Sequence, residues 1–159
     1  MAAIGALAVV VRQPLLFPSL GPTIFIQAVT PNLPAARPWN TLAGHAVGMA
    51  AAFAALALFG GFGDPPALST GALTVSRALA TALAVGLTVA GQLALRAQHP
   101  PAAATTMLLT LGEMQATGAT LIDIAVGVAL VTALGETARR LHPHHDGSRG
   151  QELRPDNGQ

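Results

Sequence analysis

Long apolar segments, separated by short polar, proline-rich or glycine-rich stretches, form the basic pattern of this chain. The three longest apolar segments are Leu42–Gly60, Ala78–Leu95 and Thr117–Thr137. Each is close to the ~20 apolar residues that a helix needs to cross a bilayer core about 30 Å thick. The hydrophobic pattern therefore predicts a membrane-spanning helix over each of these segments.

The first apolar segment, Met1–Val11, is shorter than the others. As a helix it would be about 16 Å long, which is too short to cross the hydrocarbon core. We expect it to belong to a first span that is either broken at Arg12-Gln13-Pro14 or truncated in this sequence. With this span, the expected number of spans is about four.

Two proline breaks predict two short helices. Pro22 precedes the apolar residues Ile24–Val29, and Pro100 with Pro101 precedes apolar residues up to about Leu111. Inside a helix, proline removes a backbone donor and clashes with the preceding turn, whereas it fits the first turn, where the donors are unpaired anyway. We therefore expect a short helix to begin near each break.

The two halves of the chain repeat this layout. Each half has an apolar segment, a proline break, a short apolar helix and a full span, although the residues themselves differ. The breaks are Pro18–Pro22 and Pro100-Pro101. Paired interrupted segments in corresponding positions indicate the central site of a transporter. The predicted fold is an all-α polytopic membrane helix bundle of about four spans, with two proline-broken or re-entrant half-helices in a pseudo-repeat.

The composition supports a membrane location for most of the chain. Of its 159 residues, 52% are hydrophobic and only 9% are charged, and the mean hydropathy is +0.54. A soluble domain usually carries about 25% charged residues. We therefore expect one transmembrane helix bundle over residues 1–140, in contact with the lipid bilayer, and a flexible polar tail over residues 141–159.

The few charged residues argue against nucleic acid as a partner and indicate how the chain is oriented in the membrane. All 8 basic side chains are arginines, and no basic face is interleaved with aromatic residues, so nucleic acid is not an expected partner. The chain has no cysteine, and its histidine tract at residues 142–146 lies in the flexible tail, so we expect neither a metal site nor a cofactor. The arginines near the C-terminus favour a cytoplasmic C-terminus, and we expect a bacterial inner membrane.

His99 is the main candidate for chemistry, because it stands directly ahead of Pro100 and Pro101. A helix N-terminus with unpaired N–H groups and a positive dipole end attracts anions. In one interpretation His99 binds or gates an anion, with a pH dependence that an imidazole brings near neutrality. In the other, it caps the helix and pairs the free amides. The sequence leaves both interpretations open.

Hydroxyl residues accompany both helix openings. They either line a path for the anion or bond to their own backbone, as hydroxyl side chains in membrane helices often do. His45 lies one turn into a span, where we favour a cross-helix hydrogen bond over a role in the site. Together the candidate substrate-binding residues are Ser19, Gly21, Thr23, His45, His99, Pro100, Pro101, Thr105 and Thr106.

Charged residues in or beside the spans form a second candidate group. Asp123 lies within the last span, where a charge costs roughly 2.5–3.5 kcal/mol on insertion scales. It either pairs with Arg96 or Arg77, relays protons, or lies in water near the end of the span. Arg77 and Arg96 bracket one span and are expected to extend outwards, where Arg96 adds positive potential. Glu136 is expected to pair with the arginines that follow it.

Small residues recur at helical spacing in two spans. Gly44 and Gly48 are spaced for close helix contact, and Ala125, Ala129 and Ala133 are one turn apart. We expect both rows to pack tightly. They are also compatible with a homo-oligomer.

Three stretches of the sequence form a recognisable set of motifs. They are Pro18-Ser19-Leu20-Gly21-Pro22, Arg37-Pro38-Trp39-Asn40 followed by Gly44-His45, and Gln98-His99-Pro100-Pro101-Ala102. With these stretches in the expected order, the chain resembles the HPP family of integral membrane proteins, which is named for its His-Pro-Pro motif. The resemblance implies a four-span membrane protein. It also implies transport of a small anion, because plastid and cyanobacterial relatives are associated with nitrite movement.

Three functional classes remain to be weighed. The leading hypothesis is a transporter or channel for a small inorganic anion, nitrite first, held at the two proline-capped helix openings. The alternative is a structural or assembly protein of the membrane, in which the prolines only shape the helices. An enzyme would have to use His99, Glu113 and Asp123 as acid–base groups. Since no nucleophile or metal-ligand spacing accompanies them, we expect no enzymatic activity.

Overall fold

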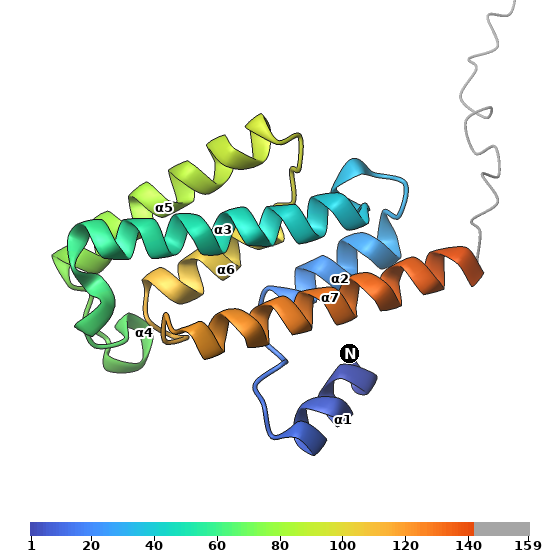
Figure 1. The fold of residues 1–159 in the computed structure, drawn as a ribbon, viewed down its shortest axis with the longest axis horizontal. Coiled ribbons are helices and arrows are strands. Elements are labelled where there is room, and N and C mark those ends of the chain that lie inside the picture. The colour runs from blue at the N-terminus through green and yellow to red at the C-terminus, as the bar shows by residue number, and fades with distance from the viewer. Residues whose placement is uncertain (142–159) are drawn as a thin grey trace, which may run out of the picture.

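The computed structural model describes residues 1–141, and every regular element in this part of the chain is a helix, which confirms the all-α prediction (Figure 1). The expected tail (residues 141–159) and the histidine tract lie outside the described residues, apart from Leu141. The elements in chain order are α1 (Ala2–Val11), α2 (Leu20–Val29), η1 (Pro34–Ala36), α3 (Pro38–Phe59), η2 (Gly61–Gly63), α4 (Ala67–Thr70), α5 (Val75–Ala94), α6 (Pro101–Thr110) and α7 (Gly118–Leu141).

Three helices, α3, α5 and α7, are long and apolar enough to cross a membrane. The prediction of about four spans is not confirmed, because α1 and α2 have only 10 residues each. The helix expected from Leu42 begins earlier, at Pro38. Proline at the first helical position has a suitable φ and lacks only a donor that would be unpaired there.

The two short helices α2 and α6 begin beside the two proline breaks. α2 starts at Leu20, directly after Ser19, and α6 starts at Pro101. Their arrangement as re-entrant half-helices in a pseudo-repeat is not confirmed and stays a prediction. Their first-turn amides are already paired with local carbonyls, for example Ala102 N with His99 O at 3.0 Å.

Helix α3 is central, lying between α5 and α7, while α6 packs against both α3 and α5 (Figure 1). The row of small residues on α3 makes this close packing feasible. A Cβ atom at Gly44 would lie 2.8 Å from His99 Cβ, and one at Gly48 would lie 2.7 Å from Thr106 Oγ1. The expected tight packing of Gly44 and Gly48 is therefore present, and their partners are α6 and the turn before it.

The alanine row on α7 does not pack as expected. Ala125, Ala129 and Ala133 are exposed, and the buried face of α7 instead includes Gly127 and Val128. A glycine is required at this contact because the connection between α1 and α2 lies too close to α7 for any side chain. A Cβ atom at Gly127 would lie 2.7 Å from Phe17 Cε1 and 2.9 Å from Leu15 O.

The apolar core joins α7 to the N-terminal third of the chain. Phe17 and Leu20 are buried in this core together with Leu109 of α6. Outside it, many large apolar side chains are exposed, among them Phe25 and Ile122 at more than half of their area. Such a surface suits contact with lipid tails, where apolar side chains need no cover from water.

Candidate functional site

Side chains from four parts of the chain meet inside this apolar bundle. Ser19 and Thr23 come from the start of α2, His45 from α3, His99 from the turn before α6, and Thr105 from α6 itself. None of the five exposes more than 1% of its area. We call them the hydroxyl–histidine cluster. The structure thus brings the two breaks of the sequence, which are far apart along the chain, to one buried place.

Hydrogen bonds connect the whole cluster. Thr105 Oγ1 lies 2.6 Å from Ser19 Oγ and 2.9 Å from His45 Nδ1. Thr23 Oγ1 lies between the two rings, 3.1 Å from His99 Nε2 and 3.4 Å from His45 Nε2. The ring centroids are 5.2 Å apart. The five side chains therefore form one continuous hydrogen-bonded line and not separate pairs.

His99 is held by neighbouring elements and does not cap α6. Its Nδ1 lies 2.8 Å from Ala35 O of η1, and its backbone N–H donates to Gln92 Oε1 of α5 at 2.9 Å. The N-cap position of α6 is Pro100, and no side chain caps this helix. The His99 side chain therefore does not cap α6, and only its backbone oxygen pairs a first-turn amide, that of Ala102. Because residue 44 is a glycine, the Cβ atom of His99 can lie against the backbone of α3 without a clash.

The remaining candidate residues of the two breaks lie outside the cluster. Gly21 and Pro100 are exposed, and Pro101 is buried but contributes no polar side chain. Thr106 is buried on another face of α6, where its hydroxyl contacts Thr88 Oγ1 at 2.9 Å and donates to its own helix. For Thr106 the backbone-bonding interpretation of the sequence is the one that the structure displays.

Two polar residues that support the cluster had not been assigned to the site. Gln92 both accepts from His99 N and donates to His99 O, and Asn40 Nδ2 donates to Gln98 O at 3.1 Å. The available signal was an amide side chain inside an otherwise apolar span, since such a group is costly in a membrane without a partner. Asn40 thereby ties the start of α3 to the residue before His99.

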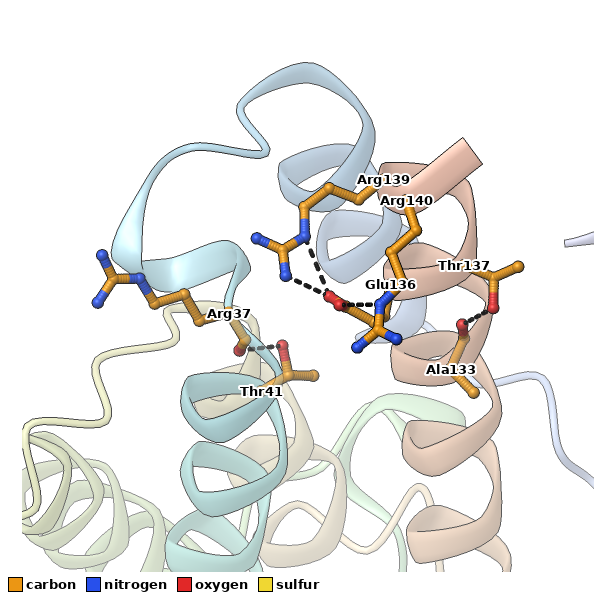
Figure 2. A network of polar contacts seen from close by, with 7 residues as sticks. All are labelled: Arg37, Thr41, Ala133, Glu136, Thr137, Arg139 and Arg140. Carbon is orange, nitrogen blue, oxygen red and sulfur yellow. Dashed lines mark hydrogen bonds and ion pairs between the residues drawn. The ribbon is translucent and has the colours of Figure 1, made fainter. Parts of the chain in front are cut away.

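The second candidate group does not join the cluster. Arg96 is exposed and Asp123 is half-buried, and within residues 1–141 the only salt bridges are those of Glu136. The suggested pairing of Asp123 with Arg96 or Arg77 is therefore not formed. Figure 2 shows Arg139 and Arg140 converging on Glu136, at 2.5 and 2.7 Å, as the sequence predicted.

Arg77 points inward, contrary to the expectation that it extends outwards. It is 4% exposed, and its guanidinium donates to the backbone oxygens of Pro65, Thr110 and Asp64. It lines a cavity of about 470 Å³ that shares no residue with the cluster. Arg77 is bound at Thr110, the last residue of α6, whereas the cluster lies beside the first half of this helix, from His99 to Thr105. Arg77 therefore ties a loop to the bundle and leaves the cluster without a cation.

The chemistry of the cluster is that of hydrogen-bond donors and acceptors without a fixed charge. Neither ring contacts a carboxylate, and within residues 1–141 no three His, Asp or Glu side chains gather as metal ligands would. Hydroxyls and imidazoles can donate to an anion or exchange protons with one another. The arrangement is therefore suited to binding a small polar solute or to moving a proton.

Three long apolar helices around a buried polar cluster define an integral membrane protein of the helical class. The chain belongs to the HPP family, whose model "HPP, transmembrane region" matches residues 1–146. A search of curated proteins and a search of solved structures found no match to the chain.

Proposed function

We propose that this HPP-family protein carries a small inorganic anion, nitrite first, across the bacterial inner membrane, and that the hydroxyl–histidine cluster is its binding site. The observation that carries the proposal is the burial of two histidines and three hydroxyls in one line inside an apolar bundle. Polar groups at membrane depth are costly, and where they occur they usually mark a substrate pathway.

The chemistry of the cluster favours a small anion over a cation. Its side chains offer O–H and N–H donors, and no carboxylate hydrogen-bonds to any of them to repel a negative charge. The cluster bonds are mutual, so a bound anion has to replace some of them. The longest is the 3.4 Å contact between Thr23 and His45, and a long hydrogen bond is the easiest one to give up.

The support comes from side chains and not from free helix amides. The sequence suggested that amides at both helix openings hold the anion, but those of the first turns are paired with local carbonyls. The anion is thus bound by the hydroxyls and imidazoles. Because the cluster is buried, we propose a carrier cycle in which helices move to expose it, in preference to an open channel.

A pair of substitutions at Thr105 tests this proposal. Thr105→Val removes the oxygen that joins Ser19 to His45 while it keeps the side-chain shape, and Thr105→Ser keeps the oxygen. A buried polar group left unpaired costs about 1–3 kcal/mol, so nitrite flux into proteoliposomes should fall about tenfold or more for valine and stay near wild type for serine. Thr137→Val, an exposed threonine bonded to Ala133 O, is the matched control. Wild-type flux no higher than that of empty vesicles would refute the transport function.

A second candidate function is a membrane assembly protein, and the exposed alanine row of α7 is the observation that favours it. Small residues on a lipid-facing helix allow another helix to approach closely. In that case Ala129→Leu would dissociate a homo-oligomer or a partner complex, while removal of the cluster would leave the complex intact. The assembly function predicts that Ala129→Leu is the damaging substitution, whereas the transport function predicts that Thr105→Val is.

A further inference from the structure

The hydrogen bonds of the cluster have a fixed direction at one end. Ala35 O can only accept, so the 2.8 Å contact requires a hydrogen on His99 Nδ1. A neutral His99 ring then has a bare Nε2, which needs a donor. The hydroxyl of Thr23 at 3.1 Å is that donor. Donation from Thr23 to Ser19 O at 2.9 Å instead would leave a buried ring nitrogen without a partner.

Neutral rings follow from the surroundings of the two histidines. α2 and α6 contain no charged residue, and His45 is the only titratable residue of α3. On α5 the charge of Arg77 is bound at the far end, and the charged residues of α7 make no hydrogen bond or salt bridge to the cluster. Exposed Arg37, beyond η1, has no hydrogen bond to either ring. An imidazolium buried without an anion would be costly.

The direction then propagates through every remaining bond. Thr23 gives its single proton to His99, so it accepts from His45, which must carry its hydrogen on Nε2. His45 Nδ1 is therefore bare and accepts from Thr105, and Thr105 accepts from Ser19. Each side-chain hydrogen is used once and both bare ring nitrogens accept a hydrogen bond, while the contact of Thr23 Oγ1 with Ser19 O carries no hydrogen. The resting cluster is a one-way chain of hydrogen bonds that runs from Ser19 to Ala35 O.

One added proton converts this chain into its reverse. When helix movement exposes the cluster to water, a proton from water enters at Ser19 Oγ; Ser19, Thr105, His45 and Thr23 then each pass one hydrogen to the next acceptor, and His99 Nε2 receives the last. Four bonds between the five side chains reverse their direction, while His99 still donates to Ala35 O. One proton has entered, the cluster has gained one positive charge, and the Ser19 hydroxyl, which no longer donates to Thr105, is free to donate to the anion.

We infer that the cluster takes up one proton with each monovalent anion, so that transport is electroneutral and is driven by a proton gradient. This inference rests on the proposed function. The cluster contains no fixed cation, and an anion bound alone at membrane depth would be an uncompensated buried charge. A proton that ends on His99 compensates the negative charge of the anion. It also reverses the hydrogen bonds that His45 and Thr105 donate.

The tautomers can be measured without any transport assay. Nitrogen-15 NMR of the ring nitrogens in lipid distinguishes N–H from bare nitrogen. In the wild-type protein at neutral pH, His99 should carry its hydrogen on Nδ1 and His45 on Nε2. A matched spectrum of Thr23→Val should lose this pairing, and Thr23→Ser should keep it. The same tautomer on both rings in the wild type would overturn the directed chain, whatever the protein transports.

The coupling is measured in proteoliposomes that hold a pH-sensitive dye. An inward nitrite gradient should acidify the lumen by one proton per anion beyond empty vesicles, and an imposed potassium diffusion potential should not change the rate. Thr23→Val should acidify no faster than empty vesicles, Thr23→Ser should recover acidification, and the exposed-site control Thr137→Val should acidify like wild type. Nitrite flux that follows the membrane potential without acidification overturns the coupling but leaves the transport function standing. Absence of wild-type flux overturns the transport function itself.

Discussion

Two glycines of α3 determine how closely this helix approaches His99 and α6. A Cβ atom at Gly44 would lie 2.8 Å from His99 Cβ and 3.3 Å from Ala97 O, and neither atom belongs to the flexible end of a side chain. At Gly48 the nearest atoms are Thr106 Oγ1 and Ala102 O. The histidines can share Thr23 only because the backbones are this close.

Gly44→Ala should therefore destabilise the protein by about 1–3 kcal/mol through overpacking and displace His99 from Thr23. Gly86→Ala on α5 is the matched control, because a Cβ atom there would meet nothing within 4 Å. That control should be neutral or gain up to about 1 kcal/mol from helix propensity. Thermal unfolding in detergent measures both, and equal midpoints for the two variants would contradict the close approach.

Gly112 likewise leaves no room for a side chain, because the guanidinium of Arg77 lies against it. Its φ is +80°, and a Cβ atom would lie 2.5 Å from Arg77 Cζ. Gly112→Ala should cost more than Gly71→Ala, which has a similar φ of +68° but open space around it. Strain at positive φ is on the order of 1–3 kcal/mol for both variants, and the clash adds to it only at position 112. Indistinguishable unfolding midpoints would show that the guanidinium moves away without cost.

At the scale of elements, the loop after η2 is tied to the start of α5 through Asp64. Ser76 and Thr74 donate hydroxyl hydrogens to Asp64 Oδ2, the latter at 2.5 Å. These bonds, first that of Ser76 and then that of Thr74, lower the pKa of Asp64 and outweigh the opposing desolvation, and the positive charge of Arg77 acts in the same direction.

A pH dependence follows from this lowered pKa. Because the folded carboxyl titrates below its unfolded value, its contribution to stability is present above about pH 4 and is lost as the pH falls through the folded pKa. Asp64→Asn should remove that part of the acid sensitivity. Unfolding midpoints recorded from pH 7 down to pH 3 would measure this, and parallel curves for wild type and variant would rule the contribution out.

The elements also reveal how far sequence patterns reach. Apolar length predicted α3, α5 and α7, and proline chemistry predicted that short helices begin near residues 22 and 100. The prediction that the alanine row of α7 packs tightly was wrong, because the spacing of small residues does not determine which face of a helix is buried. The buried face includes Gly127, which lies against Phe17. The prediction that Arg77 extends outwards was wrong for a similar reason, since the carbonyls that it binds come near it only in the folded protein.

At the scale of the whole molecule, the polar chemistry concentrates where the two breaks meet. Hydroxyls and a histidine beside paired breaks indicated Ser19, Thr23, Thr105 and His99 as candidates together, but the same pattern also indicated Thr106, whose hydroxyl contacts Thr88 instead. Ala35 O was not foreseeable, because a backbone carbonyl has no sequence signature and reaches His99 only through the path of η1. His45, for which a cross-helix bond was favoured, makes that bond and is a full member of the cluster.

The most direct test of the central claim, that the cluster is the anion-binding site, is nitrite uptake into proteoliposomes at matched protein density for wild type, His99→Ala and the exposed-site control Thr137→Val. The account predicts uptake well above empty vesicles for wild type and Thr137→Val, and uptake at the level of empty vesicles for His99→Ala. Equal uptake by His99→Ala and wild type would contradict it.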